Sequence, residues 1–475
     1  MMDAFAPAVQ WFEWFVLAYF VVLNATYLLL VVVAAATMAR RTVTDTDAAT
    51  DDIFANPLTP AVSVLVPAHN EEAGIVESVR AMLALRYPKL EVVVIDDGST
   101  DATFAHLEEE FGLIDTVPAL EPEVATLGAV RSMHVMRNGG PLVVIRKESG
   151  GTKADALNAG LNAARHPLVC MVDADSVLES DALLRVARPF VDDPRRVVAT
   201  GGVVRAANGS RVYRGAVEEV RQPKRWIERI QIVEYLRSFL LGRTGWSQLG
   251  GLLIVSGAFG LFRRDEVVAA GGLNTATLGE DADLVVTLHR RAREAHRPYR
   301  VVYVPEPVCW TEVPTSWQVL GRQRRRWSTG LAQVLWRHRT MMGNPRYGRI
   351  GTFALPFHLM FELLGPVIEF LGVAMLIVGL ILGIVNVEFA ILFVVVAVLW
   401  GITLSVAALT VEELASHRYE RWRDLAIAYA AAVLENLGYR QIHAWWRLRG
   451  LVTAIRRQPN TWGTMTRTGF TPTQD

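Results

Sequence analysis

The feature that most constrains this chain is a run near its amino end that contains no charged residue. The run extends from Trp14 to Ala39, and Arg40 and Arg41 follow it directly. A helix of this length crosses a hydrocarbon core of roughly 30 Å. The run is longer than the apolar part of a signal peptide, and the basic pair follows it instead of preceding it. The sequence therefore predicts a membrane helix whose carboxyl end lies in the cytoplasm, the side that basic residues favour.

A second apolar block lies towards the carboxyl end, from about residue 353 to residue 411. Within it, residues 367–387 and 389–411 are each long enough to span a bilayer. Residues 425–446 are rich in alanine but contain Glu435, Asn436 and Arg440, so they fit either a span inside a bundle or a helix at the interface. The basic tail favours the cytoplasm, whereas a third span here would place it outside. The sequence leaves this choice open.

The overall composition fits a chain with apolar ends and a more polar middle. Apolar residues make up 51% of its 475 residues, and the formal net charge of +0 argues against a nucleic-acid binder that relies on bulk charge. Two cysteines, Cys170 and Cys309, exclude a disulfide framework. We expect five parts: an amino-terminal transmembrane helix (1–41), a linker (42–60), a cytoplasmic domain with amphipathic interfacial helices (61–349), a carboxy-terminal transmembrane region (350–446) and a basic tail (447–475).

The middle of the chain alternates short β-branched runs with helical stretches. The expected strands are residues 62–66, 91–95, 143–145 and 169–172, whereas residues 112–142 show no clear period. Asn70 has the character of a helix N-cap, because two acidic residues follow it. Strand, polar turn and helix recur in this order. The pattern predicts an α/β domain with a parallel sheet and ligands at the carboxyl ends of its strands.

Two carboxylates follow the predicted strand 169–172. Asp173 and Asp175 are separated by one residue, so both can converge on one point in the loop. Carboxylates this close repel each other unless a cation sits between them. Oxygen ligands with open positions suit Mg²⁺ or Mn²⁺ carrying a phosphorylated ligand. Taken alone, the pair is more often a solvated turn.

A predicted helix start follows the glycine pair Gly150 and Gly151. Thr152 and Asp155 have the spacing of a capping box. Lys153 then lies in the first turn, where the helix dipole disfavours a cation. A bound phosphate would relieve that cost, and a helix amino terminus suits an anion. A solvated lysine is the alternative.

Together, these segments resemble the motifs of the membrane-integrated family 2 glycosyltransferases. This group includes the hyaluronan, chitin, cellulose and poly-N-acetylglucosamine synthases. The resemblance covers roughly residues 60 to 340, in the order and spacing of the family. The matching segments are residues 64–71, 94–101, 153–158, 173–175, 256–258, 279–281 and 323–327.

The resemblance implies a GT-A-type, Rossmann-like α/β domain with a mostly parallel sheet and transmembrane helices at both ends. It also implies a UDP-sugar donor and a metal, Mg²⁺ or Mn²⁺, held by Asp173 and Asp175. In the family the first two motifs hold the uridine, and a lysine and an arginine lie near the diphosphate. The implied donor-binding residues are Pro67, His69, Glu71, Asp96, Asp97, Lys153, Asp173 and Arg326.

Glu280 and Asp281 fill the place of the family's Thr-Glu-Asp motif, with Gly279 where threonine is usual. The resemblance assigns Asp281 as the general base on the acceptor hydroxyl, with Glu280 beside it in the catalytic motif. One carboxylate is enough for a single inverting displacement. The missing threonine bears on the local acceptor contacts more than on the base. The same acidic residues also suit a helix amino end, which is compatible with catalysis.

The segment 323–327 matches the family's Gln-x-x-Arg-Trp motif. There the arginine meets the diphosphate, for which a guanidinium is apt, and the tryptophan stacks on the acceptor sugar. The acceptor-binding residues implied here are Gln323, Trp327, Ser256 and Gly257. Trp317, Leu320 and Trp327 also fall at helical spacing, which is typical of a basic amphipathic helix on the inner membrane surface. Both descriptions fit one helix.

We therefore expect an inverting, metal-dependent and processive glycosyltransferase that extends a β-linked polysaccharide. It would be a multi-pass protein of the bacterial cytoplasmic membrane, in contact with lipids and coupled to export. The alternatives are a single transfer onto a lipid acceptor and a non-catalytic channel or sensor with a nucleotide-binding domain. The Gln-x-x-Arg-Trp motif favours a polymer, and the retained Asp281 argues against a sensor. The sugar, the linkage and any accessory subunits are not specified by the sequence.

Overall fold

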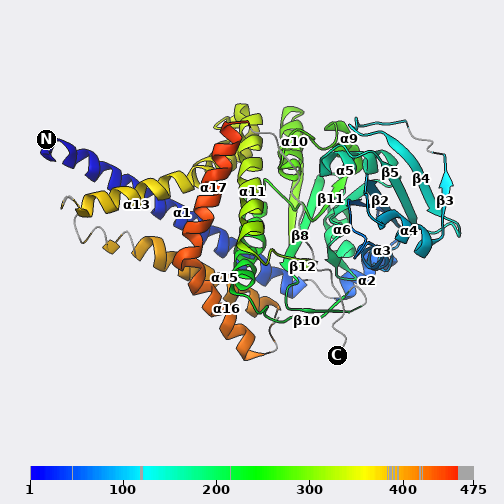
Figure 1. Cartoon of the computed structure of the whole chain (residues 1–475), viewed down its shortest axis with the longest axis horizontal. Coiled ribbons are helices and arrows are strands. Elements are labelled where there is room, and N and C mark those ends of the chain that lie inside the picture. The colour runs from blue at the N-terminus through cyan, green and yellow to red at the C-terminus, as the bar shows by residue number, and fades with distance from the viewer. Residues whose placement is uncertain are drawn as a thin grey trace.

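The computed structural model in Figure 1 shows a sheet-containing body with a bundle of helices beside it. The structure describes residues 2–44, 47–117, 121–213, 216–381, 383, 388, 391–392, 395–416, 419 and 421–457.

One sheet of ten strands organises the body, in the order β3-β4-β5-β2-β1-β6-β11-β8-β12-β7. A separate hairpin pairs β9 with β10. The strands are β1 (Val62–Ala68), β2 (Leu90–Asp97), β3 (Leu113–Thr116), β4 (Val130–Met136), β5 (Leu142–Lys147), β6 (Leu168–Val172), β7 (Val177–Leu178), β8 (Val197–Ala206), β9 (Arg211–Tyr213), β10 (Ala216–Glu219), β11 (Phe259–Arg263) and β12 (Arg300–Thr311).

The sheet is mixed, so the prediction of a mostly parallel sheet is wrong. Strands β5, β2, β1 and β6 run parallel, as do β8 and β12, but β11 lies between β6 and β8 and is antiparallel to both. An antiparallel neighbour needs no parallel crossover, and β11 enters the sheet after the helical residues 226–248 and the loop 249–258. Strands β3 and β4 lie in residues 112–142, and His134 is the one buried residue of β4. This partial burial explains why the sequence there shows no clear apolar period.

Helices cover both faces of the sheet, because the apolar residues of the central strands alternate between the two sides. Leu65 packs in one core with α5, α9 and α10, whereas Val64 and Val66 pack in the other with α3, α4 and α6. These helices are α3 (Ile75–Leu83), α4 (Thr103–Phe111), α5 (Lys153–Ala163), α6 (Ala182–Asp192), α9 (Arg264–Ala269) and α10 (Glu280–Glu294).

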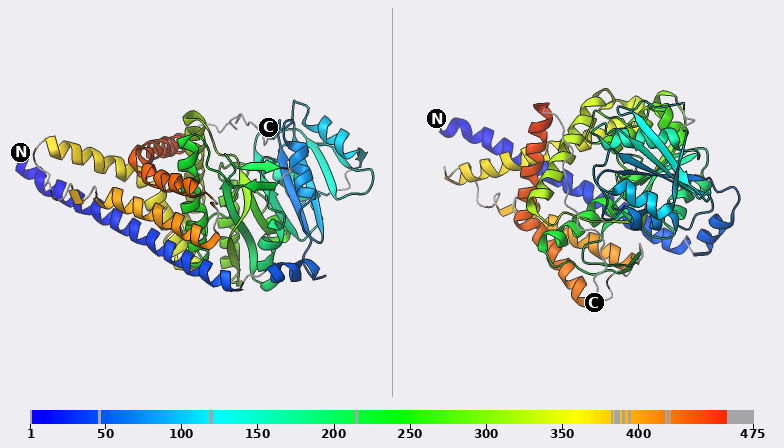
Figure 2. Two further views of the ribbon diagram at one scale, coloured as in Figure 1. Left: turned by 90° about the horizontal axis from the view of Figure 1, so that it is seen from below. Right: turned by 45° about the vertical axis from the view of Figure 1, so that its right-hand side comes forward.

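The remaining helices form the bundle that extends away from the sheet in both views of Figure 2. Within the bundle, α11 packs against α17, α7 against α16, and α8 against α1. Helix α8 also contacts β12, and α7 contacts β8, so the bundle and the body are in direct contact. The bundle elements are α1 (Met2–Thr44), α7 (Trp226–Tyr235), η1 (Leu236–Gly242), α8 (Arg243–Gln248), α11 (Trp317–Arg337), α13 (Gly365–Ile381), α15 (Trp400–Ser416), α16 (Trp422–Leu434), η7 (Glu435–Tyr439) and α17 (Arg440–Ile455). The predicted linker also contains a helix, α2 (Asp47–Ala55).

Among the residues that the structure describes, one helix segment, Trp14–Arg40, is long and apolar enough to cross a membrane. Ile350–Leu363 and Gly365–Gly379 pass the same test only as a pair, and they are bent by 44°. The apolar helix predicted at the amino end is therefore present, but the described residues do not provide a matching straight helix at the carboxyl end. The predicted spans 367–387 and 389–411 include residues 382, 384–387, 389–390 and 393–394, which lie outside the described part.

Residues 425–446 do not form one straight helix. Leu437 and Gly438 have non-helical backbone angles, and this break separates α16 from α17. Residues 447–455 of the predicted tail belong to α17, whereas residues 458–475 lie outside the described residues.

Candidate active site

The carboxyl ends of β1 and β2 bring the first two sequence motifs together. Ala68 lies opposite Asp96 in the parallel register, so both strands end at the same edge of the sheet. The His69 Nδ1 atom lies 2.8 Å from the carbonyl oxygen of Asp97. The Asp96 carboxylate accepts a hydrogen bond of 2.9 Å from the backbone N–H of Ser99 and so closes the turn after β2.

The loop between β1 and α3 differs from the predicted helix start. Asn70 is not an N-cap, since α3 begins after Gly74. Asn70 adopts a left-handed backbone with φ 56°, a conformation that asparagine tolerates better than most residues. Its side-chain oxygen accepts a hydrogen bond of 2.8 Å from the backbone N–H of Thr100. The backbone N–H of Glu71 donates to the Thr103 hydroxyl at 2.8 Å. These hydrogen bonds connect the loop after β1 to the turn after β2.

A buried lysine connects the end of β2 to the first turn of α5. The Lys147 ammonium lies 2.7 Å from the Asp97 carboxylate and 2.6 Å from the Asp155 carboxylate, and its side chain is 0% exposed. The Ser149 hydroxyl donates to the other Asp97 oxygen at 3.1 Å. The sequence analysis missed Lys147. The signal available in the sequence was that Lys147 follows the predicted strand 143–145; the register of the structure places it opposite Asp97.

The helix start predicted at Thr152 is confirmed, since its side chain accepts from the backbone N–H of Asp155. The return bond of a capping box is not among the described contacts, because the Asp155 carboxylate binds Lys147 and the backbone N–H groups of Leu127 and Gly128. Lys153 follows in the first turn and extends to β6 and β11. Its ammonium contacts the Asp173 carboxylate and donates a hydrogen bond of 2.7 Å to the carbonyl of Gly257. Burial acts to lower the pKa of Lys153, but the carboxylates of Asp173, Glu280 and Asp281 together outweigh this effect and raise the pKa above its usual range. Lys153 therefore stays charged.

Asp173 and Asp175 lie in the turn between β6 and β7. Within the described residues, no group of three or more histidine, cysteine, aspartate or glutamate side chains is arranged to hold a metal ion. Two carboxylates are nevertheless a fitting partial shell for Mg²⁺ or Mn²⁺, which take further oxygens from phosphate and water. The contact of Lys153 with Asp173 shows that this carboxylate already accommodates a cation.

Glu280 and Asp281 occupy the first turn of α10 and face this lysine. A Cβ atom added to Gly257 would lie 2.7 Å from the Asp281 Oδ2 atom, so the carboxylate lies directly against the glycine. Burial, followed by repulsion from Asp281, raises the pKa of Glu280 to about 7. The positive charges of Lys153 and Arg326 lower the pKa of the same carboxyl group. Five predicted residues (Lys153, Gly257, Glu280, Asp281 and Arg326) therefore lie close enough to interact, although their motifs are far apart in the chain.

Gly279, which replaces the usual threonine, lies where two helices meet. A Cβ atom added to Gly330 of α11 would lie 2.9 Å from the backbone nitrogen of Gly279. The amino end of α10 therefore packs against the backbone of α11. This contact fixes Glu280 and Asp281 relative to the helix that carries the Gln-x-x-Arg-Trp motif.

The predicted acceptor residues have separate environments. Trp327 is 38% exposed, and the guanidinium of Arg324 lies 4.2 Å from the centroid of its ring. The side-chain oxygen of Gln323 is buried and has no hydrogen-bond partner among the described residues. The Ser256 hydroxyl accepts hydrogen bonds from the backbone N–H groups of Ala258 and Phe259, at 3.2 and 3.3 Å. Ser256 therefore shapes the start of β11.

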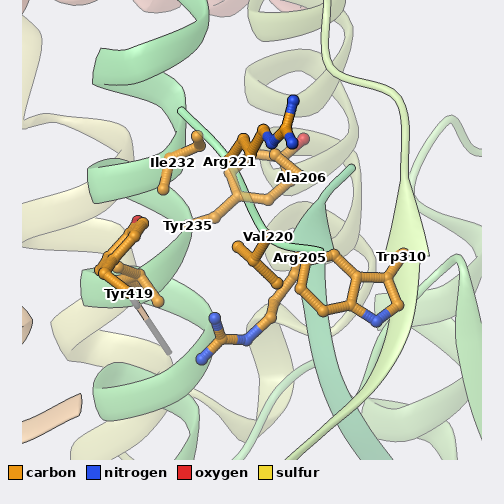
Figure 3. Close-up of a pocket in the computed structure, with 9 residues that line it drawn as sticks. Arg205, Ala206, Val220, Arg221, Ile232, Tyr235, Trp310 and Tyr419 are labelled. Carbon is orange, nitrogen blue, oxygen red and sulfur yellow. The ribbon is translucent and has the colours of Figure 1, made fainter. Parts of the chain in front are cut away.

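A small cavity lies beside this region, lined in part by Arg205, Tyr235, Trp310 and Tyr419 (Figure 3). Its volume of about 20 Å³ suits about one water molecule. It is too small for a sugar ring, so it does not correspond to the predicted acceptor site.

Two family profiles match the chain. The profile described as "Glycosyltransferase like family 2" matches residues 60–330, and the profile described as "Chitin synthase" matches residues 265–448.

Two curated relatives have similar sequences. The poly-beta-1,6-N-acetyl-D-glucosamine synthase of Staphylococcus aureus (strain COL) is 26% identical over 312 residues, which is 65% of this chain and 63% of the relative. The "Probable glycosyltransferase YdaM" of Bacillus subtilis (strain 168) is 26% identical over 281 residues, or 58% of this chain and 56% of the relative. The chain thus spans less than two thirds of the length of either relative.

Solved structures with a similar fold include a mannosyltransferase. The mannosyltransferase PcManGT from Pyrobaculum calidifontis, in complex with GDP-Man and Mn²⁺, aligns with a TM-score of 0.50 and 20% identity over 90% of this chain and 99% of that one.

Proposed function

This chain belongs to the glycosyltransferase family 2 enzymes, and we propose that it transfers a sugar from a UDP-sugar to the growing end of a β-linked polysaccharide. Family membership rests on a profile match over more than half of the 475 residues. Its relatives include polysaccharide synthases. The mixed α/β sheet is consistent with a GT-A fold.

The donor would bind along the edge where β1, β2 and β6 end. Pro67, His69, Glu71, Asp96 and Asp97 would form the uridine end. Lys153 and Arg326 would face the diphosphate, because both cations act on the Glu280 carboxyl group and so lie near the same point. UDP-N-acetylglucosamine is the first donor to test, since the Staphylococcus aureus relative is named a poly-N-acetylglucosamine synthase.

The proposed metal, Mg²⁺ or Mn²⁺, would be held by Asp173 and Asp175. When bound, it would supply positive charge to the departing nucleoside diphosphate. Lys153 would then turn from the Asp173 carboxylate towards the phosphates while keeping its hydrogen bond to Gly257.

The observation that carries the proposal is the position of Asp281 against Gly257, whose carbonyl binds Lys153. A group that accepts a proton thus lies next to a group that attracts the donor diphosphate. We assign Asp281 to take the proton from the acceptor hydroxyl as that oxygen attacks the anomeric carbon, with inversion. A protonated Glu280, favoured up to about pH 7, removes a repelling charge beside this base.

The acceptor would approach over Trp327, whose partly exposed indole suits the C–H face of a sugar ring. Gln323, Ser256 and Gly257 would border this approach. The bundle that includes α1 lies beside the body (Figure 2), and α1 contains the segment that is long and apolar enough to cross a membrane. On this basis we propose a multi-pass enzyme of the bacterial cytoplasmic membrane. We propose processive synthesis coupled to export through this bundle.

The test uses the purified full chain in detergent with Mg²⁺ or Mn²⁺ and a panel of UDP-sugars, with UDP release as the readout. We expect one donor to be preferred and its labelled product to form a ladder on a gel. Linkage-specific hydrolases then identify the bond. A product with a single added sugar on lipid would replace the polymer with a lipid acceptor, and no UDP release from any donor would refute the proposal.

A further inference from the structure

An ion pair that the proposed chemistry does not use is buried between α7 and α11. The carboxylate of Glu234 lies 2.8 Å from the guanidinium of Arg324, and the two side chains are 11% and 2% exposed. The Tyr439 hydroxyl donates to the same carboxylate at 2.9 Å. Three separate elements therefore meet at Glu234, and the third, η7, belongs to the carboxy-terminal part of the bundle.

Arg324 connects this carboxylate to the proposed acceptor surface. Its guanidinium lies 4.2 Å from the ring centroid of Trp327 and 5.9 Å from that of Tyr235. Both distances are within the range of a cation–π contact. One part of the Trp327 indole thus contacts a charged plane, while 38% of the residue remains exposed for a ligand.

The guanidinium needs a fixed partner, because a buried cation without one is costly. Arg324 is a planar fork that stacks on an aromatic ring and donates to a carboxylate at the same time, which lysine cannot do. The groups that face Glu234 are Arg324, Tyr439, the more distant Arg237 and Glu435, and His443, whose Nε2 atom lies 3.7 Å from the second Glu234 oxygen. Burial acts to raise the pKa of Glu234, but Arg324, His443, Arg237 and the hydrogen bond from Tyr439 together outweigh it and lower the pKa. Glu234 therefore remains an anion that holds Arg324 in place.

We propose that Glu234 is a positioning residue for the acceptor: it holds Arg324 against the indole of Trp327 and so fixes the surface on which the acceptor sugar stacks. The inference rests on the proposed function and assigns a role to a residue outside the family motifs. Since Tyr439 binds the same carboxylate, the carboxy-terminal helices contribute to the orientation of the acceptor surface.

The central variant is Glu234→Gln, which keeps the shape and removes the charge. With UDP-N-acetylglucosamine as donor and a β-linked N-acetylglucosamine tetrasaccharide as acceptor, we expect KM for the tetrasaccharide to rise about tenfold. The KM for the donor, and UDP release without the tetrasaccharide, stay at wild-type values. Glu228→Gln is the matched control, because Glu228 is also a buried glutamate of α7 but bonds Asn208 and the backbone of Arg225. It should leave both KM values unchanged.

A double-mutant cycle separates positioning from general support of the fold. If Glu234 acts through Trp327, then Glu234→Gln adds little to the acceptor KM of Trp327→Phe. Should Glu234→Gln not fold, Arg324→Lys and Tyr439→Phe replace it, since each keeps the Glu234 charge. Each should raise the KM for the acceptor and leave the KM for the donor unchanged. An unchanged acceptor KM, an equal rise in both KM values, or full additivity with Trp327→Phe would overturn the inference. Absence of UDP release from the wild-type protein would instead refute the proposed function.

Discussion

The contact between Gly257 and Asp281 gives a sharp test of the proposed general base. In Gly257→Ala the new methyl carbon would lie 2.7 Å from the Asp281 Oδ2 atom, and the next atoms of that side chain would be 3.5 and 4.0 Å away. To regain an ordinary contact of about 3.4 Å, the carboxylate oxygen must move by about 0.7 Å. A misplacement of about 1 Å in a reacting group can cost about a hundredfold in rate. We therefore expect kcat to fall by about one to two orders of magnitude.

The same substitution should change stability little. The clashing atom is the end of a flexible side chain, so the fold does not have to absorb the roughly 1–3 kcal/mol of an overpacked core. The assay compares initial rates of UDP release with thermal unfolding of the full chain. Gly242→Ala is the control, because Gly242 has a helical φ of −59° and only one neighbour within reach, at 3.4 Å. A Gly257→Ala enzyme with the wild-type kcat would refute the assignment of Asp281.

Three further predictions concern the same cluster. Asp281→Asn should lower kcat by at least about a hundredfold with unchanged thermal unfolding, and near-normal turnover would exclude it as the base. Asp173→Ala should abolish the dependence of UDP release on added Mg²⁺ or Mn²⁺, whereas an unaltered metal titration would place the ion elsewhere. Because the folded protein raises the pKa of Glu280 to about 7, it binds more protons than the unfolded chain between about pH 4.5 and 7. This contribution to the free energy of unfolding is present at low pH and is lost as pH rises through about 7. Glu280→Gln should remove this pH dependence from the unfolding free energy measured by chemical denaturation. Identical pH profiles for the variant and the wild type would contradict the shift.

Local sequence was enough to predict the parts of the site that stand at strand ends. Asp97 and Asp173 follow apolar runs, and parallel register brings the ends of such strands to one edge of the sheet. The helix start at Thr152 could also be predicted, because its N-cap hydrogen bond joins residues three apart in the sequence. The geometry of the turns was harder to predict from sequence. Asn70 was predicted as an N-cap, but its conformation depends on a hydrogen bond to a loop thirty residues away in the sequence.

Contacts between distant residues could not be predicted from one sequence. Lys147 and Asp97 are 50 residues apart, and Arg324 and Glu234 are 90 apart. No periodic pattern encodes such pairs, since each depends on how whole elements pack. The antiparallel β11 was missed for the same reason, because strand direction depends on the path of the loop before it. Hydropathy predicted the apolar amino-terminal helix, and the bend between the helices at 350–363 and 365–379 lies beside Pro356, His358 and Glu362, residues that favour a kinked or interfacial helix.

The buried Lys147 has a consequence for the cost of binding a nucleotide. It joins Asp97, at the proposed uridine end, to Asp155, in the first turn of the helix that carries Lys153. These two parts of the proposed donor site are therefore held together before a nucleotide arrives. A site that is already ordered loses little conformational entropy on binding, so more of the contact energy would remain as affinity.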